Sequence, residues 1–220
     1  IMHLSHSPVA KLMTKLYPQI PAISSIHSEV ISLEHPILHD NIKKYIAIRP
    51  EIKDYLISEH NIPEEKIEVI YNPIDSNRFK PSNKPQDDKK VILFVGTVDY
   101  LRKNMLMDLV LRTKVEGSEL WVVGKENGVT MNDIKSNDDN HVTYYGPKSN
   151  VEDYINKCTE TAGILLGRTT IEGWLCGKEG WIYNVDDAGN ILSKELHKVP
   201  EDVDKFKSEN VITKIIEEYK

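Results

Sequence analysis

The stretch Lys90-Val-Ile-Leu-Phe-Val-Gly96 decides the fold of this chain. It is a continuous apolar run that ends at a glycine, as expected of a parallel strand with helices packed on both faces. The same arrangement recurs in Glu119-Leu-Trp-Val-Val-Gly124 and in His141-Val-Thr-Tyr-Tyr-Gly146. Further strands are predicted at 162–166 and 180–183, and helices at about 104–114, 151–159 and 170–176.

Strands that alternate with helices predict right-handed crossovers and a parallel sheet, which places this part of the chain in the α/β class. In such sheets, ligands bind outside the carboxyl ends of the strands. Those ends are predicted at Gly96, Gly124, Gly146 and Gly167. Residues that bind a ligand are therefore expected directly after these glycines.

Composition divides the chain into segments. Residues 1–79 contain short apolar runs and a predicted helix, which indicates a second, smaller α/β domain. Residues 80–88 are polar, include two prolines and have no periodicity, as in a linker. Residues 89–190 form the predicted Rossmann-type domain, and residues 191–220 are expected to be a charged helical tail.

The composition excludes several classes of protein. Of the 220 residues, 40% are hydrophobic and 28% charged, which is typical of a globular protein, and the net charge of −6 gives no reason to expect a nucleic-acid partner. Cys158 and Cys176 lack the spacing of a zinc site, so no metal is expected. No apolar run approaches the ~18 residues of a membrane span. We expect a cytoplasmic protein, peripheral to the membrane at most.

The most informative motif is Gly167-Arg-Thr-Thr-Ile-Glu-Gly-Trp-Leu-Cys-Gly177. Here a strand ends, a glycine turns the chain and a helix begins, and the free N–H groups of a helix N-terminus favour a phosphate. Thr169 and Thr170 would cap the helix or donate hydroxyls to the same anion, and Arg168 adds a charged donor. Glu172 can accept two ribose hydroxyls. A purely structural interpretation stands beside this one, in which Thr169 caps the helix and Glu172 favours its dipole.

A second motif, Gly96-Thr-Val-Asp-Tyr-Leu-Arg-Lys-Asn104, follows the strand that opened the analysis. Gly96 permits close approach of the backbone, and Thr97 follows it. Arg102 and Lys103 stand at the start of the next helix, where they would neutralise a diphosphate. Taken alone, they are more simply a solvated basic pair. The functional interpretation gains because both motifs follow strands of one sheet.

These motifs, in this order, resemble those of retaining glycosyltransferases of the GT-B type, which have two Rossmann domains, and in particular the family-4 group. The resemblance covers about residues 20–190. It is also carried by Ile20-Pro-Ala-Ile-Ser-Ser-Ile-His-Ser-Glu29, Tyr45-Ile-Ala-Ile-Arg-Pro-Glu-Ile-Lys-Asp-Tyr-Leu56 and Ile62-Pro-Glu-Glu-Lys-Ile-Glu-Val-Ile-Tyr-Asn-Pro-Ile-Asp75. It implies a GT-B-like α/β fold in which residues 89–190 bind the donor and residues 1–79 are a partial acceptor domain, without its first strands.

The resemblance also implies roles for individual residues. Glu172 would hold the donor ribose, Lys103 would meet the diphosphate, and His27 would lie near the transferred sugar; these three form the expected catalytic set. A satisfied surface or core histidine is the structural alternative for His27. No cofactor is expected, because the nucleotide diphosphate-sugar is a substrate. The expected donor-binding set is Gly96, Thr97, Arg102, Lys103, Gly167, Arg168, Thr169, Thr170 and Glu172.

Two positions depart from the family pattern. Ile164 stands where the family often has a glutamate, eight residues before the ribose-binding one, and Thr97 stands where it often has an arginine. Arg168 or Arg102 is a candidate to replace the missing positive charge, because each lies beside one of the two predicted phosphate-binding loops.

The sequence therefore predicts a glycosyltransferase that moves a sugar from a nucleotide diphosphate-sugar, such as a UDP-sugar, to a hydroxyl acceptor. The acceptor is a glycan, a lipid-linked sugar or a small molecule, and the resemblance implies retention of configuration without a metal. The alternative is a nucleotide-sugar-binding subunit of a split transferase, which needs a partner chain to complete the acceptor domain. A sugar-nucleotide epimerase of the same architecture is a third, less favoured reading.

Overall fold

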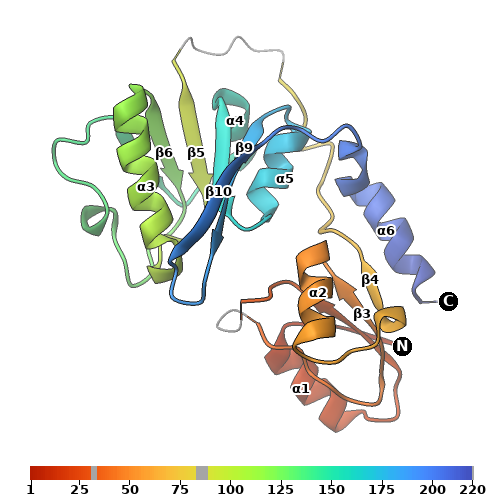
Figure 1. Cartoon of the computed structure of the whole chain (residues 1–220). Helices are drawn as coiled ribbons and strands as arrows, with labels where there is room; N and C mark the ends of the chain where they lie inside the picture. The colour runs from red at the N-terminus through yellow and green to blue at the C-terminus, as the bar shows by residue number, and fades with distance from the viewer. Residues whose placement is uncertain (31–33, 83–88, 220) are drawn as a thin grey trace. The chain divides into compact units, whose positions relative to one another are not determined.

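The computed structural model describes residues 1–30, 34–82 and 89–219, which form two compact units (Figure 1). Unit 1 comprises Ile1–Pro73 and Lys205–Lys220, and unit 2 comprises Ile74–Asp204. The chain thus leaves unit 1 once and returns to it after unit 2. Most of the predicted linker, residues 83–88, lies outside the described residues, and the change of unit comes before it, between Pro73 and Ile74.

Unit 1 contains a parallel sheet in the order β1-β2-β3-β4. Its register pairs Ser24 with Tyr45 and Tyr45 with Ile67. The strands are β1 (Met2–Ser5), β2 (Ala22–Ile26), β3 (Ile42–Ala47) and β4 (Ile67–Val69), and the helices are α1 (Ser7–Leu16), α2 (Pro50–Ser58), η1 (Glu64–Lys66) and α6 (Ser208–Glu217). A further short helix, η3 (Val203–Phe206), spans the boundary between the two units.

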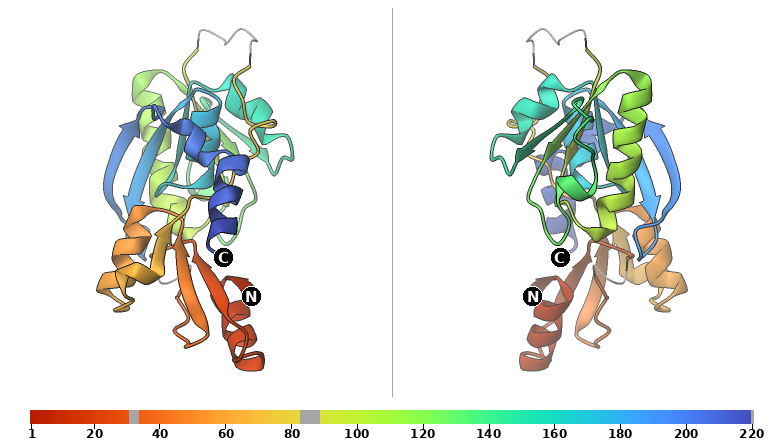
Figure 2. Two further views of the ribbon diagram at one scale, coloured as in Figure 1. Left: turned by 90° about the vertical axis from the view of Figure 1, so that its right-hand side faces the viewer. Right: turned by 90° about the vertical axis from the view of Figure 1, so that its left-hand side faces the viewer.

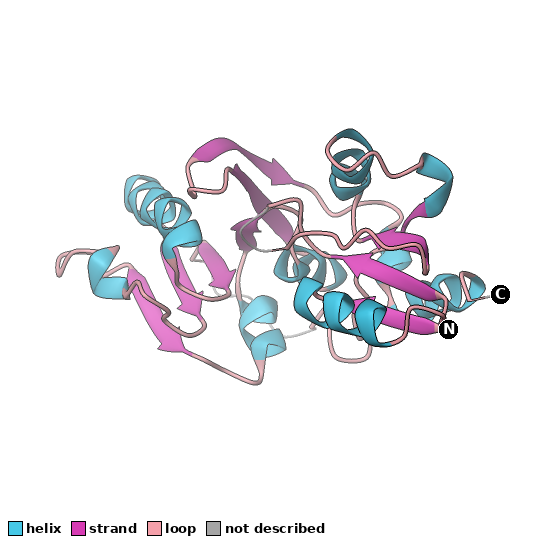
Figure 3. Ribbon diagram, turned by 90° about the horizontal axis from the view of Figure 1, so that it is seen from below, coloured by secondary structure: helices cyan, strands magenta, loops and turns pink. Residues whose placement is uncertain are grey.

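Alternation along the strands gives this sheet two apolar faces. Leu4 and Ile26 pack with Ile52 and Leu56 of α2 and with Ala10 of α1 in one cluster. A second cluster joins Ile23, Ile46 and Ile70 to Val211 of α6. Because successive side chains of a strand point to opposite faces, the sheet is covered on both sides, by helices from opposite ends of the chain. Figure 3 shows the helices beside the strands from below.

Unit 2 contains a six-stranded sheet in the order β10-β9-β8-β5-β6-β7. All neighbouring strands are parallel except β10, which is antiparallel to β9. The strands are β5 (Val91–Val95), β6 (Glu119–Val123), β7 (Val142–Gly146), β8 (Glu160–Ile164), β9 (Glu179–Val185) and β10 (Ile191–His197), and the helices are α3 (Tyr100–Glu116), η2 (Met131–Asp133), α4 (Val151–Lys157) and α5 (Arg168–Leu175). The predicted α/β fold with parallel sheets is confirmed.

The strand order of unit 2 has a switch point. The chain runs outward from β5 through β6 to β7, then crosses back to β8 on the other side of β5. Helix α3 lies on one face of the sheet and α4 on the other, as both views of Figure 2 show. Ile92 and Phe94 of β5 pack with Met105 and Leu109 of α3 in the main cluster of this unit. Two-sided cover explains why β5 is apolar throughout.

The structure differs from the predicted helical tail at 191–220. Residues Ile191–His197 form β10, which joins β9 through a tight turn where Gly189 has φ 78°. Lys194 and Glu195 lie on this edge strand, where charged residues are exposed to solvent. In the sequence, this exposed charged pattern resembles that of a solvent-exposed helix, which explains the wrong prediction. Helix α6 does follow, but Val211 is only 1% exposed, so the helix is part of the core of unit 1 and not a free tail.

Helix α5 packs closely on β8 and β9 because a glycine stands at each contact. Gly173 of α5 faces β8, and Gly180 of β9 faces α5. A Cβ atom on Gly173 of α5 would lie 2.8 Å from the Thr161 side chain of β8. A Cβ on Gly180 of β9 would lie 2.6 Å from Cγ2 of Thr170. Real Cβ contacts are longer, so only glycine allows this approach.

We therefore expect Gly173→Ala to lower the free energy of unfolding by about 1–3 kcal/mol, as overpacked cores do. Gly163→Ala is the matched control, since a Cβ there would meet only Oγ1 of Thr170, at an ordinary 3.8 Å. Urea unfolding followed by tryptophan fluorescence reports on unit 2, because all three tryptophans lie in it. Equal loss of stability in both variants would contradict the close-packing explanation.

Candidate functional site

A hollow of about 330 Å³ opens in unit 2 beside the carboxyl ends of its strands. Val95 at the end of β5 and the first turns of α5 belong to its wall, so it lies at the switch point between β5 and β8. Open α/β sheets bind ligands at this place. The lining residues are Arg78, Phe79, Val95, Lys148, Ser149, Val151, Arg168, Thr169 and Glu172.

The N-terminus of α5 is open to a ligand. Its N-cap is Gly167, and no side chain caps it. At α3, by contrast, the Asp99 side chain already accepts a hydrogen bond from the Arg102 N–H at 3.1 Å. A helix N-terminus that lacks an acidic cap leaves its N–H groups and its dipole for an external anion. The arrangement therefore favours α5 over α3 as the place for a phosphate.

Neither threonine side chain caps the helix, which was one of the two roles predicted for them. The hydroxyl of Thr169 donates to the carbonyl of Val95 at 3.1 Å and ties α5 to the end of β5. Thr170 is 1% exposed and faces the glycines of β8 and β9. Its hydroxyl has no hydrogen-bond partner within the described part of the chain. Both side chains therefore position the helix, and only the backbone N–H groups of the first turn remain for an anion.

The turn from β8 into α5 is strained. Leu165 has φ 55°, in the left-handed region that residues with a Cβ rarely adopt. The N–H of Gly167 donates back to the carbonyl of Leu165 at 2.9 Å, which holds the turn closed. Strained backbone of this kind is often found where a site needs a sharp change of direction.

Glu172 is the buried carboxylate of the hollow, at 6% exposure. Its Oε1 accepts a hydrogen bond from Nε of Arg168 at 2.7 Å. Burial raises the pKa of Glu172 above its ordinary value, while the charges of Arg168 and Arg78 partly offset that effect by lowering it. The charged form of Glu172 is therefore stabilised only in part by its neighbours. Its carboxylate can accept a further hydrogen bond from a ligand.

Basic side chains surround this carboxylate. Nε of Arg78 donates to Glu152 at 2.7 Å, and its guanidinium also donates to the carbonyl of Ser149. These bonds fix Arg78 against the N-terminus of α4. Together, Arg78, Lys148 and Arg168 bring three positive charges to the wall of the hollow. This charge and the α5 N-terminus suit a doubly charged anion such as a diphosphate.

The glycine loop after β5 follows the strand end as predicted, but its residues do not line this hollow. The N–H of Gly96 donates to the carbonyl of Val123 at 2.9 Å, and Arg102 pairs with Asp99 at 2.5 Å. Lys103 is half-buried in the first turn of α3. Of the predicted donor-binding set, Arg168, Thr169 and Glu172 line the hollow, whereas Gly96, Thr97, Arg102, Lys103, Gly167 and Thr170 do not.

Among the polar residues that line the hollow, three were not predicted as site residues: Arg78, Lys148 and Ser149. Lys148 and Ser149 follow Gly146, which had been identified as a strand end, so the rule that ligands lie after such ends could have found them. Arg78 precedes the sheet by more than ten residues, and only the tertiary fold brings it to α4.

His27 lies in unit 1, directly after β2. Its ring stacks on His6, with the centroids 5.4 Å apart, and its backbone N–H donates to Glu34 at 2.5 Å. Burial lowers the pKa of His27, Glu34 raises it in part, and His6 lowers it further. His6, His27 and Arg49 follow β1, β2 and β3 respectively, so the carboxyl ends of this sheet also carry polar side chains.

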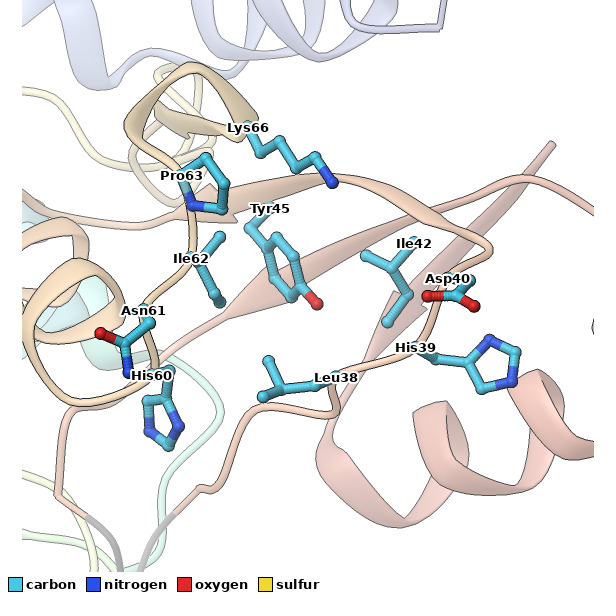
Figure 4. Close-up of a pocket in the computed structure, with 10 residues that line it drawn as sticks. All are labelled: Leu38, His39, Asp40, Ile42, Tyr45, His60, Asn61, Ile62, Pro63 and Lys66. Carbon is cyan, nitrogen blue, oxygen red and sulfur yellow. The ribbon is translucent and has the colours of Figure 1, made fainter.

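A second hollow of about 320 Å³ lies in unit 1 near the start of β3, at the opposite end of the strands from His27 (Figure 4). Its titratable side chains include His39, His60 and Lys66. In Figure 4 the two imidazoles lie at opposite sides of the hollow and do not converge. Across residues 1–30, 34–82 and 89–219, no group of three or more His, Cys, Asp or Glu side chains could hold a metal ion. None of the helices described is both long and apolar enough to cross a membrane.

Comparison with known structures identifies the fold. A crystal structure of a glycosyltransferase from Rickettsia africae matches 100% of this chain and 76% of its own, with a TM-score of 0.69 and 14% sequence identity. The fold is that of the GT-B glycosyltransferases. The Anabaena protein HepE, solved with UDP and glucose, matches 83% of this chain and 57% of its own, with a TM-score of 0.60 and 16% identity.

Sequence comparison finds a family similarity for the N-terminal part of the chain. Residues 1–78 match Glycosyltransferase Family 4, so they form a domain similar to that family. An uncharacterized glycosyltransferase of Methanocaldococcus jannaschii is 32% identical over a region that covers 37% of this chain. The chain spans 28% of the length of that relative.

The burial of Glu172 predicts a stability effect that depends on pH. A carboxyl whose pKa is raised on folding contributes stability below its unfolded pKa, and that contribution is lost as the pH rises through the folded pKa. Glu172→Gln should therefore unfold at higher urea concentration than the wild type at pH 7, with the difference vanishing near pH 4. Urea titrations at the two pH values check this, and a variant less stable than the wild type at pH 7 would contradict it.

The surroundings of His27 predict its titration. The imidazole should titrate below its ordinary pKa in an NMR experiment, because burial disfavours the charged ring. His6→Ala removes a charge that lowers this pKa and should raise it, whereas Glu34→Gln should lower it further. Shifts of the opposite sign would show that the His6–His27–Glu34 arrangement is wrong.

Proposed function

We propose that this chain is a glycosyltransferase that binds a nucleotide diphosphate-sugar in the hollow of unit 2 and transfers its sugar to a hydroxyl acceptor. The observation that carries the proposal is the pairing of an uncapped α5 N-terminus with the buried carboxylate of Glu172 five residues after Gly167. One group suits phosphates and the other suits ribose hydroxyls. The GT-B fold and the family-4-like domain of residues 1–78 support it.

The diphosphate is assigned to the α5 N-terminus. The backbone N–H groups of its first turn, with Arg168, Lys148 and Arg78, would stabilise the negative charge that develops as the sugar leaves. Preorganised donors of this kind act without a reorganisation step, so they supply much of the catalysis. Retention of configuration and transfer without a metal, which the resemblance to the family implies, are part of the proposal. The UDP complexes of HepE make uridine a reasonable base to test first.

The ribose is assigned to Glu172. Its Oε1 already accepts from Arg168, so the carboxylate is held in one orientation while its second oxygen is left for a hydroxyl. The neutral imidazole of His27 is proposed to serve the acceptor half of the reaction, as the family resemblance implies. The acceptor is a glycan, a lipid-linked sugar or a small molecule, and the cytoplasm is the proposed compartment.

One observation favours a second candidate function, a nucleotide-sugar-binding subunit that needs a partner chain for activity. Ile164, at the end of β8, packs in the main apolar cluster of unit 2, where the family often has a carboxylate near the donor sugar. No substitute carboxylate lines the hollow besides Glu172 among the described residues. Binding of UDP without transfer to any added acceptor would favour this subunit over the enzyme.

The proposal is tested by measuring UDP affinity in matched arginine variants. Arg168→Ala should weaken UDP binding by about tenfold, because it removes a charge-assisted contact at the α5 N-terminus. Arg102→Ala is the control, since Arg102 pairs with Asp99 outside the hollow, and its affinity should stay within about twofold of the wild type.

The assay is a thermal shift with UDP, GDP and their sugars, because a ligand of the native state raises its stability by mass action. No shift with any of these nucleotides would end both candidate functions. A loss in Arg102→Ala and none in Arg168→Ala would move the diphosphate to the α3 loop.

A further inference from the structure

Three aromatic side chains gather on unit 2 away from the donor hollow. The ring centroids of Tyr145 and Tyr154 are 4.9 Å apart, and those of Trp121 and Tyr145 are 5.6 Å apart, all in edge-to-face geometry. Trp121 and Tyr154 are 6.4 Å apart. All three side chains are only half-buried. They line a separate hollow of about 190 Å³ with Asn150, Asp153 and Lys157.

The fold places this cluster on the α4 side of the sheet. Leu120 and Val122 of β6 pack in the cluster on the α3 side, so Trp121 between them points to the opposite face. Tyr145 of β7 lies at a register shift between β6 and β7, and its ring meets that of Trp121, whereas Tyr144 packs on the α3 side. Tyr154 reaches the cluster from α4. These three aromatic rings therefore remain partly exposed at the surface and are not enclosed in the core.

The polar rim comes from one stripe of α4. Asn150, Asp153 and Lys157 are spaced three and four residues apart, so they lie on one side of the helix. Ser149 and Val151 point instead into the donor hollow. The amide of Asn150 donates to Oδ2 of Asp153 at 2.9 Å, which fixes this pair beside the rings. The two hollows therefore share α4 and have no lining residue in common.

Trp121 is held in a defined orientation. Its indole N–H donates to Oε2 of Glu119 at 2.9 Å, so the polar edge of the ring is satisfied within the protein. The remaining surface of the ring is apolar. Aromatic rings fixed in this way lose little entropy on binding and present a rigid contact area.

We propose that this aromatic hollow of unit 2 binds one sugar ring of a carbohydrate chain, outside the donor site. A pyranose has apolar C–H faces, which pack on aromatic rings, and a rim of hydroxyls, which hydrogen-bond to carboxylate, amide and ammonium groups. The hollow has room for about six waters at ~30 Å³ each, which suits one ring and is smaller than the ~300 Å³ at which pockets for larger ligands begin. A carbohydrate therefore matches both the aromatic rings and the polar rim of the hollow.

The test follows the indole N–H resonance of Trp121 in NMR titrations of the full chain. The probes are four tetrasaccharides, built of glucose, galactose, mannose or N-acetylglucosamine. At least one should shift the Trp121 resonance and leave Trp174 and Trp181 unmoved. Tyr154→Ala and Asp153→Ala should weaken that affinity by about two- to tenfold. Leu111→Ala, exposed on α3, is the matched control and should bind as the wild type does.

Several outcomes would overturn the proposal. Absence of a shift with all four tetrasaccharides, or unchanged affinity in both variants, removes the site. Displacement of the sugar by UDP would make the hollow part of the donor site. The same shift with choline would identify a cage for cations instead. Asp153 is exposed, so Asp153→Ala decides the matter if Tyr154→Ala fails to fold. Because no lining residue of the donor hollow is changed, failure here leaves the proposed donor site untouched.

Discussion

The candidate site depends on how closely α5 can approach the sheet. Gly173 and Gly180 remove the two Cβ atoms that would hold the helix away, and the hydroxyl of Thr169 bonds its first turn to the end of β5. With the helix fixed there, its N–H groups open at the switch point of the sheet. The same placement carries Glu172 into the wall of the hollow. A helix displaced by the width of a methyl group would lose both features together.

This placement has an energetic cost. Glu172 sits in a buried position that raises its pKa, and its ion pair with Arg168 is shared with solvent, since the arginine side chain is 61% exposed. Leu165 holds a left-handed backbone at the preceding turn. A core apolar residue in place of Glu172 would suit the burial better. The buried Glu172 and the strained Leu165 therefore both lower the stability of unit 2 at the candidate site, as is common for residues that interact with a ligand.

The sequence allowed much of unit 2 to be predicted, because β5 and β6 are largely apolar and are followed directly by a glycine. Strand β8 (Glu160–Ile164) begins and ends two residues before the predicted strand at 162–166, since its first residues, Glu160 and Thr161, are polar. Strand β1 and helix α1 were missed, since Met2–Ser5 is short and polar at alternate positions and gains its meaning only beside β2. Asp99 could have been recognised as a helix cap from its position three residues before Arg102. Arg78 could not have been recognised as a residue of the hollow, because its position depends on a contact with Glu152, 74 positions later.

The return of the chain to unit 1 has a consequence during synthesis. Ile23, Ile46 and Ile70 form an apolar face that Val211 of α6 joins, about 140 residues later, with Ile215 and Tyr219 packed against the cluster. At about 5–20 residues per second, the ribosome needs ~7–28 s to make that distance. Through this interval the nascent sheet exposes an uncovered apolar surface, while unit 2 can fold behind it. A chaperone that binds nascent chains would find its client in the first unit, not the second.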